Sequence, residues 1–178
     1  HHEPPAILPP TAALVDPKLG APDGMEHLAG VGVAFKLCHA VLKRLIAGGA
    51  SSADLPDLRE YLDLVALGTV CDIVPLVGEN RVLVRHGLQR LARAPRPGLR
   101  ALCRVAGVDG APSCYHLAYL LGPRLNAAGR TGSADPALAL LLTQDPEEAD
   151  VLADELDAAN RERQRREAAI LELAVAQL

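Results

Sequence analysis

The chain has 178 residues, enough for one ordinary domain with a sizeable core. Its apolar content of 49% and charged content of 22% exclude a disordered tail. The net charge of −4 gives no global attraction to nucleic acid, and no apolar run reaches the roughly 18 residues of a membrane span. Aromatic residues make up 2% of the chain, which favours helices packed on a small sheet and leaves few rings for base stacking.

The cysteines show no spacing that is typical of a metal site or a disulfide framework. No CxxC pair and no paired-histidine pattern accompanies them, so neither zinc nor disulfide bonding is indicated. Scattered thiols in a chain without a signal peptide indicate a reduced compartment, and we expect a cytoplasmic protein. The four residues are Cys38, Cys71, Cys103 and Cys114.

Helices dominate the predicted elements of the first half. Residues 3–24 are rich in proline and predict a loop with a short strand at 12–15. A helix is expected from Leu28 until Gly48-Gly49 ends it, and a second one over 58–70. Asn80 is expected to cap a third helix that runs to about residue 94. The apolar stripe of the first helix is Val33, Leu37, Ala40, Val41 and Leu45.

Shorter helices follow before one long helix. Pro97 predicts the start of a helix that ends near residue 107, and Ser113 caps another over 115–121, which Gly122-Pro123 interrupts. Asp135-Pro136 opens a short helix, with Asp at the N-cap and Pro at the first helical position. Asp145-Pro146 repeats this signal, and no breaker follows it before residue 178.

The last predicted helix is long enough to connect two domains. It has more than thirty residues, or on the order of 50 Å at 1.5 Å per residue. Residues 161–167 are charged on most faces, as expected where a helix leaves one domain for another. With nothing to pack on, its apolar end looks truncated.

One acid, Asp72, stands in an otherwise apolar run, LVALGTVCDIVPL at residues 64–76. A buried ionised carboxylate costs several kcal/mol unless it is paired, hydrogen-bonded or bound to a metal. The sequence therefore predicts a compensating group, and a divalent cation is the most interesting candidate. An N-cap or a turn carboxylate is the alternative interpretation.

Two further motifs have side chains that suit metal or phosphate chemistry. His1-His2 precedes Glu-Pro-Pro and is either the remnant of an artificial tag or part of a metal motif, since one imidazole can ligate while its neighbour donates to a substrate oxygen. Residues 122–130, GPRLNAAGR, bring Arg124, Asn126 and Arg130 together with two glycines and predict an anion site. A helix that ends at Gly129 with exposed arginines is the alternative.

A run of arginines also allows two interpretations, a phosphate-binding surface or a solvated helical face. No acid lies between Arg81 and Arg104, so the run could bind phosphate, but a solvated helical face is the favoured interpretation. Its members are Arg81, Arg85, Arg90, Arg93, Arg96, Arg100 and Arg104.

Together these motifs resemble a known family. HHEPP, VALGTVCDIVPL, GPRLNAAGR and DELDAANRERQ follow one another as in the RecJ single-stranded-DNA exonucleases of the DHH phosphoesterase superfamily. The resemblance covers essentially all 178 residues. It implies an α/β fold, with residues 1–144 as the mostly helical C-terminal part of a DHH catalytic domain. Residues 145–178 would form the helix that connects it to a C-terminal domain.

The resemblance also implies roles for individual residues. The chain begins at the two histidines of the family's Asp-His-His motif, so His1 would ligate one of two Mn²⁺ or Mg²⁺ ions and His2 would contact the scissile phosphate. Asp72 matches a later metal-binding aspartate. Arg124, Asn126 and Arg130 match an element expected near the nucleic-acid path or supporting the active site.

What the resemblance implies for function concerns the longer parent protein. The parent would hydrolyse single-stranded DNA from its 5′ end in repair and recombination, as a monomer, with single-strand-binding protein or a helicase as partners and no membrane. Without the upstream aspartate motifs, the isolated segment is expected to be inactive. Two alternatives stay open: a DHH phosphodiesterase for oligonucleotides or dinucleotides, and an inactive DHH-type replication scaffold.

Overall fold

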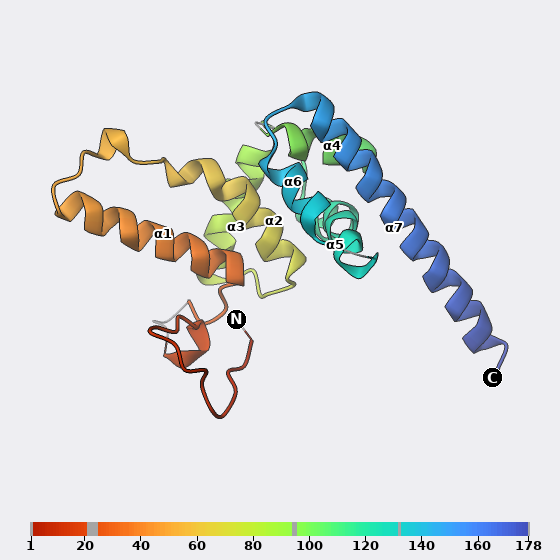
Figure 1. Ribbon diagram of the computed structural model, residues 1–178, viewed down its shortest axis with the longest axis horizontal. Helices are drawn as coiled ribbons and strands as arrows, with labels where there is room; N and C mark the ends of the chain where they lie inside the picture. Colours follow the sequence, from red (N-terminus) through yellow and green to blue (C-terminus); the bar gives the residue numbers. More distant parts are fainter. Residues whose placement is uncertain (1, 21–24, 94–95, 132, 178) are drawn as a thin grey trace. The chain divides into compact units, whose positions relative to one another are not determined.

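The computed structural model describes residues 2–20, 25–93, 96–131 and 133–177, with backbone only at 130 and 131. Every regular element in these ranges is helical (Figure 1). The predicted low strand content is therefore confirmed for the described chain, while the α/β class of the whole domain stays a prediction. The expected strand at 12–15 is wrong, because this segment is an irregular loop.

The chain divides into two compact units, His1–Arg90 and Leu91–Leu178. In the first unit α1 (Gly30–Ala47) and α2 (Leu62–Cys71) pack on each other, and η3 (Leu58–Tyr61) leads directly into α2. The predicted end of α1 at Gly48 is confirmed, since the Gly48 N–H donates to the carbonyl groups of the last turn. The short helices η1 (Pro17–Leu19) and η2 (Ser52–Asp54) complete this unit with α3 (Gly78–Leu91).

The core of the first unit is small and aliphatic. Leu28, Val65 and Leu83 form its buried centre, and Phe35 packs against it. The sequence had predicted that Asn80 caps α3. This prediction is wrong, because Asn80 lies inside the helix. Its buried side-chain amide instead donates to two loop carbonyls, those of residues 27 and 75, at 2.6 and 3.0 Å. These bonds fix the chain that enters α1 and α3.

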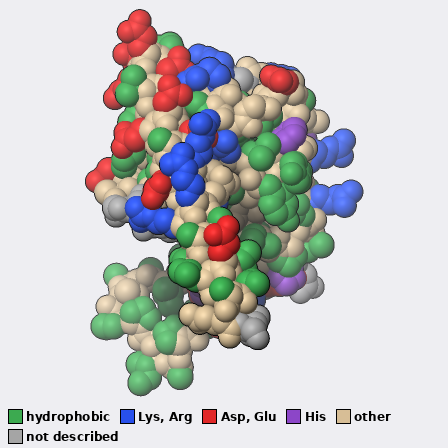
Figure 2. All heavy atoms as spheres, turned by 90° about the vertical axis from the view of Figure 1, so that its right-hand side faces the viewer, with side chains coloured by type: hydrophobic (Ala, Val, Ile, Leu, Met, Phe, Trp, Pro, Cys, Tyr) green, Lys and Arg blue, Asp and Glu red, His purple; other side chains and the backbone are tan. Residues whose placement is uncertain are grey.

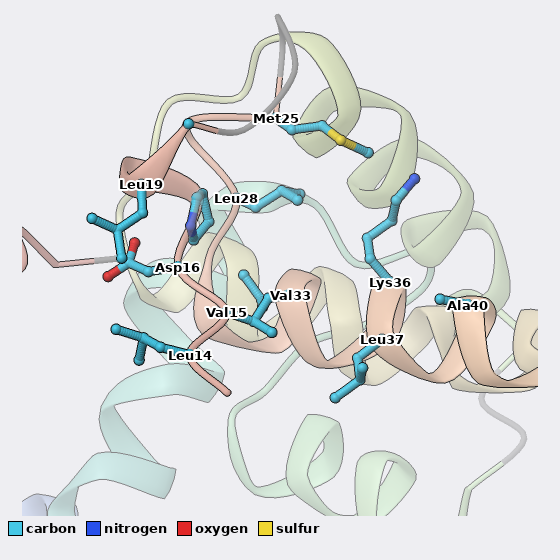
Figure 3. Close-up of a pocket in the computed structure, with 12 residues that line it drawn as sticks. Leu14, Val15, Asp16, Leu19, Met25, Leu28, Val33, Lys36, Leu37 and Ala40 are labelled. Carbon is cyan, nitrogen blue, oxygen red and sulfur yellow. The ribbon is translucent and has the colours of Figure 1, made fainter. Parts of the chain in front are cut away.

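One face of α1 stays open to solvent. Three apolar residues of its predicted stripe, Leu37, Val41 and Leu45, are about half exposed. Next to them, α1, η3 and α2 line an apolar groove of about 550 Å³. On another side, the N-terminal loop and α1 line a cavity of about 390 Å³, and Leu14, Val15, Val33 and Leu37 are among the lining residues labelled in Figure 3.

The second unit is a bundle built around the start of its longest helix. Helices α4 (Pro97–Val105), α5 (Gly122–Thr131) and α6 (Asp135–Leu142) all pack against α7 (Pro146–Val175). Gly98 allows α4 to approach the backbone of Leu140 in α6, because a Cβ at this position would clash with that carbonyl group. The fully buried side chains include Leu99, Leu102, Leu117, Leu121, Leu140 and Leu156.

The helix before GPRLNAAGR is not interrupted at Gly122-Pro123. A π-helix, η4 (His116–Leu121), passes directly into α5. A proline inside an α-helix lacks an N–H donor, and its ring clashes with the carbonyl group four residues earlier. The wider i→i+5 winding just before Pro123 accommodates this ring. The predicted break is therefore a change of helix type.

Helix α7 confirms the predicted long C-terminal helix. Asp145 caps it, because its carboxylate accepts from the Glu147 N–H at 2.9 Å. Figure 2 shows acidic groups toward its start, basic groups in the middle and hydrophobic groups toward its end. Ion pairs four residues apart, Arg163–Glu167 and Arg166–Glu162, support its charged part. In the part of the chain that the structure describes, no helix combines the length and apolarity needed to cross a bilayer.

Candidate metal and nucleic-acid sites

Asp72 lies at the C-terminal end of α2, where its backbone N–H donates to the Gly68 carbonyl oxygen at 3.0 Å. The following residue, Ile73, has φ +59° and is 88% exposed. A left-handed residue commonly ends a helix, but it is usually glycine, and a β-branched side chain there is strained. This tight ending turns Asp72 outward into solvent. The prediction that Asp72 is buried is therefore wrong, although its position in the motif is as expected.

The electrostatics at this helix end favour a cation. The last carbonyl groups of a helix carry the negative end of its dipole, so a carboxylate at this end adds to an existing negative potential. Next to it, burial and, to a lesser extent, the negative charge of Asp72 raise the pKa of the Cys71 thiol to about 11. A cation beside Asp72 would therefore be favoured by this helix end even though the carboxylate is exposed.

The other predicted metal-site residues are only partly covered. His1 lies outside the described residues, and His2 is exposed. Within the described ranges, no three His, Cys, Asp or Glu side chains gather in a way that could hold a metal ion. The convergence of His1, His2 and Asp72 on one metal site stays a prediction.

Arg124 points into the second unit. Its Nε donates to Asp157 Oδ1 in α7 at 2.9 Å, its Nη1 to the Leu120 carbonyl oxygen at 2.7 Å, and its Nη2 to the Val105 carbonyl oxygen at 3.3 Å. Both charged side chains are largely buried, with exposed fractions of 14% and 8%. These contacts join α4, η4, α5 and α7. They give Arg124 a structural role in this unit, and its expected place near the nucleic-acid path or in support of the active site stays a prediction.

Two other residues of GPRLNAAGR, Asn126 and Gly129, lie on the exposed side of α5. Asn126 and Gly129 are exposed, whereas the two alanines between them are buried. Asn126, Gly129 and Arg130 are three and four residues apart, so their backbone positions share one helix face; the side chain of Arg130 lies outside the described residues. A Cβ at Gly129 would meet nothing within 4 Å. No packing contact in the described chain therefore requires glycine here, and the open backbone would allow a ligand to approach closely.

Sequence reasoning missed two buried acids. Asp63, in the first turn of α2, is fully buried; it accepts from the Leu64 N–H at 2.8 Å, and Arg90 Nε lies 4.0 Å from it. Asp157 lies on the inward stripe of α7 and pairs with Arg161 at 2.7 Å in addition to Arg124. The spacing of residues along α7 could have revealed Asp157, because this acid continues the three- and four-residue spacing of the buried residues Ala149, Ala153 and Leu156.

Two members of the arginine run also have structural positions. Arg90 Nε donates to the Glu60 carbonyl oxygen at 2.9 Å. Arg104 in α4 pairs with Asp150 and Asp154 of α7 at 3.0 and 3.1 Å, which raises the pKa of its guanidinium group. The run is therefore not one uniform phosphate-binding face.

Comparison with known proteins gives consistent matches. The single-stranded-DNA-specific exonuclease RecJ of Bacillus subtilis is 47% identical over 167 residues, covering 93% of this chain and 20% of that protein. RecJ of Escherichia coli is 45% identical over 169 residues, covering 92% of this chain and 29% of that protein. No protein-family model matches the chain.

Solved structures agree with the sequence matches. The crystal structure of Thermus thermophilus RecJ in complex with Mn²⁺ has a TM-score of 0.86 at 42% identity, covering 99% of this chain and 26% of that one. A second structure, exonuclease RecJ bound to manganese, has a TM-score of 0.85 at 41% identity, with coverage of 99% and 43%. Over nearly all of its length the chain is therefore similar in sequence and fold to a segment of RecJ exonucleases, and it spans between 20% and 30% of the length of the curated relatives named RecJ that it matches.

Proposed function

We propose that this chain is part of a metal-dependent exonuclease that degrades single-stranded DNA from the 5′ end. The observation that carries the proposal is the 47% identity to a RecJ exonuclease over 93% of the chain, together with a backbone that superposes on RecJ with a TM-score of 0.86. The motifs around Asp72 and Asn126 lie within this matched region.

The metals of the proposed activity are Mn²⁺ or Mg²⁺, which the matched RecJ crystals contain. Asp72 fits a metal ligand, because its carboxylate is exposed at the negative end of α2. An imidazole from His1 would add a nitrogen ligand beside the carboxylate, and such a mixed ligand set fits Mn²⁺ better than it fits Mg²⁺, which prefers oxygen ligands alone. Two divalent ions need more ligands than these two residues supply, so we propose that the longer protein provides the others and that residues 1–178 alone are inactive. When bound, such ions supply an activated water and neutralise charge at the phosphate.

The exposed face of α5 is the proposed contact with the DNA backbone. Asn126 would donate from its amide to a phosphate oxygen, and the open backbone at Gly129 would let the strand approach. Arg124 would act from the inside by fixing α5 against α7. His2 would orient the phosphate next to the metals. The DHH domain assignment, the connecting role of residues 145–178, a monomeric state and partners such as single-strand-binding protein or a helicase stay predictions for the complete protein.

The test is a nuclease assay with the complete protein. Oligonucleotides labelled at either end, single-stranded or duplex, are incubated with Mn²⁺ and with EDTA. We expect Mn²⁺-dependent shortening of the single strand from its 5′ end, and a loss of at least about a hundredfold for Asp72→Ala. Because Asp72 is exposed, its replacement should leave the unfolding midpoint nearly unchanged.

Two outcomes would contradict the proposal. Near-normal rates for Asp72→Ala would remove its role as a ligand. Cleavage of dinucleotides without cleavage of long strands would favour the phosphodiesterase alternative, and no cleavage at all with intact DNA binding would favour an inactive scaffold.

A further inference from the structure

The exposed positions of the helix at residues 114–131 fall into two pairs. Between residues 114 and 129, the exposed residues are Tyr115, Tyr119, Asn126 and Gly129. Tyr115 and Tyr119 are about one turn apart in and beside η4, and Asn126 and Gly129 are about one turn apart in α5. Both pairs belong to one continuous helix, whose exposed edge therefore combines two aromatic rings with two outward residues of GPRLNAAGR.

The two rings face solvent as a pair. The centroids of Tyr115 and Tyr119 lie 5.1 Å apart with the ring planes 33° from parallel, and the residues are 61% and 68% exposed. The chain contains three tyrosines, one phenylalanine and no tryptophan. Aromatic residues usually contribute by burying 150–250 Å² each, and an exposed i,i+4 pair adds only about 0.2–0.5 kcal/mol to a helix. Helix stability thus gives little reason to place half of these scarce rings in water.

The backbone holds this pair in place. An i→i+5 turn contains more than four residues, so residues four apart lie more nearly above one another in η4 than in an α-helix. His116 packs its ring edge-on against Tyr115, with centroids 5.9 Å apart. The Ser113 N–H donates to His116 Nδ1 at 3.2 Å and anchors the imidazole. The two rings therefore form an exposed aromatic platform with His116 packed against one side of it.

The charge around the platform suits a polyanion. No acidic residue occurs between Asp109 and Asp135, although the chain as a whole has a net charge of −4. The same segment contains Arg130, while the charge of Arg124 is paired with Asp157. A single strand on this edge would meet no carboxylate from its own segment.

We propose that Tyr115 and Tyr119 are a base-stacking platform on the same continuous helix as the proposed phosphate-contacting residues of α5. A DNA single strand would lie along this edge, with bases on the two rings and its backbone near Asn126 and Gly129. Tyr119 and Asn126 are seven residues, or roughly 10 Å, apart along the helix axis, a distance that a few nucleotides of a single strand can span. The inference rests on the proposed function and adds the residues that contact the bases. Binding would show no sequence preference, because every base has a face that can stack on a ring.

The experiment measures binding by the complete protein in EDTA, so that the strand is not cut. Two fluorescent probes of equal length are used, an oligothymidylate and an abasic oligonucleotide with the same number of phosphates. We expect Tyr115→Ala/Tyr119→Ala, which removes two stacking rings, to weaken binding of oligothymidylate by at least about thirtyfold. Binding of the abasic strand should change less than twofold. The salt dependence of oligothymidylate binding should be unchanged, because no phosphate contact is lost.

Two control variants separate stacking from general damage. Tyr115→Phe/Tyr119→Phe keeps both rings and should bind oligothymidylate within about twofold of the unsubstituted protein. Tyr61→Ala removes an exposed tyrosine from the other unit and should have no effect. Circular dichroism and an unfolding curve check that every variant is folded.

The outcomes distinguish this inference from the proposed function. If the double alanine variant binds oligothymidylate normally, or loses affinity for both probes equally, the stacking platform is wrong even though the exonuclease assay succeeds. The inference would also be overturned if the double alanine variant lost affinity for a protein partner but not for oligothymidylate. If the unsubstituted protein neither binds nor degrades single strands, the proposed function fails together with the platform.

Discussion

The ion pair between Arg124 and Asp157 gives the sharpest test of how the second unit is held together. Replacing Arg124 with alanine removes three hydrogen bonds and leaves the Asp157 carboxylate largely buried. Breaking a buried pair by removing one partner typically costs about 3–5 kcal/mol. Asp157 would keep Arg161 at 2.7 Å, so the lower end of this range, about 3 kcal/mol, is expected for Arg124→Ala.

The matched control is the second arginine on the same carboxylate. The Arg161 side chain is 66% exposed, and exposed pairs contribute at most about 1 kcal/mol. Urea unfolding of Arg124→Ala, Arg161→Ala, Asp157→Ala and the two double variants gives two coupling energies. We expect about 2–3 kcal/mol for Arg124 with Asp157, and less than about 1 kcal/mol for Arg161 with Asp157.

The same variants decide whether Arg124 also binds DNA. If Arg124 contacts a phosphate, Arg124→Ala should lower the salt slope of single-strand binding by about 0.7, the value for one phosphate on single-stranded nucleic acid. The structure predicts an unchanged slope and a large loss of stability. Equal and small stability losses for Arg124→Ala and Arg161→Ala, with a reduced slope, would refute the structural assignment.

Three further predictions concern close packing, thiol chemistry and backbone strain. Gly98→Ala should lower the free energy of unfolding by about 1–3 kcal/mol, because its Cβ would press on a carbonyl group of α6. Gly129→Ala has open space and should raise the free energy of unfolding by up to about 1 kcal/mol. Urea unfolding compares the two variants, and equal effects would contradict the packing. With a pKa of about 11, Cys71 holds about one thiolate in a thousand molecules at pH 8, rising tenfold per pH unit. Iodoacetamide in EDTA should therefore label the exposed Cys38 first, and mass spectrometry showing equal labelling would count against the buried thiol. Ile73→Gly should raise the free energy of unfolding by about 1 kcal/mol, since glycine adopts φ +59° without strain and little burial is lost; a destabilised variant would show that the left-handed backbone is not costly.

Local signals determined most of the helices. Gly48 ended α1 and Asp145-Pro146 began α7 as predicted, because caps and breakers act over a few neighbouring residues. The same local reasoning failed at Gly122-Pro123. A proline normally breaks a helix, yet here the helix continues by changing its winding, and the sequence pattern does not reveal such a change.

The sequence by itself determined the family motifs, their order and the place of Asp72 within them. Only the tertiary structure decided which side chains face solvent. It turned Asp72 outward at a strained helix end, and it turned Arg124 inward onto Asp157. The physical reason is that burial and ion pairing depend on partners far away in the chain, 33 residues in the case of Arg124, whereas motif spacing records only neighbours.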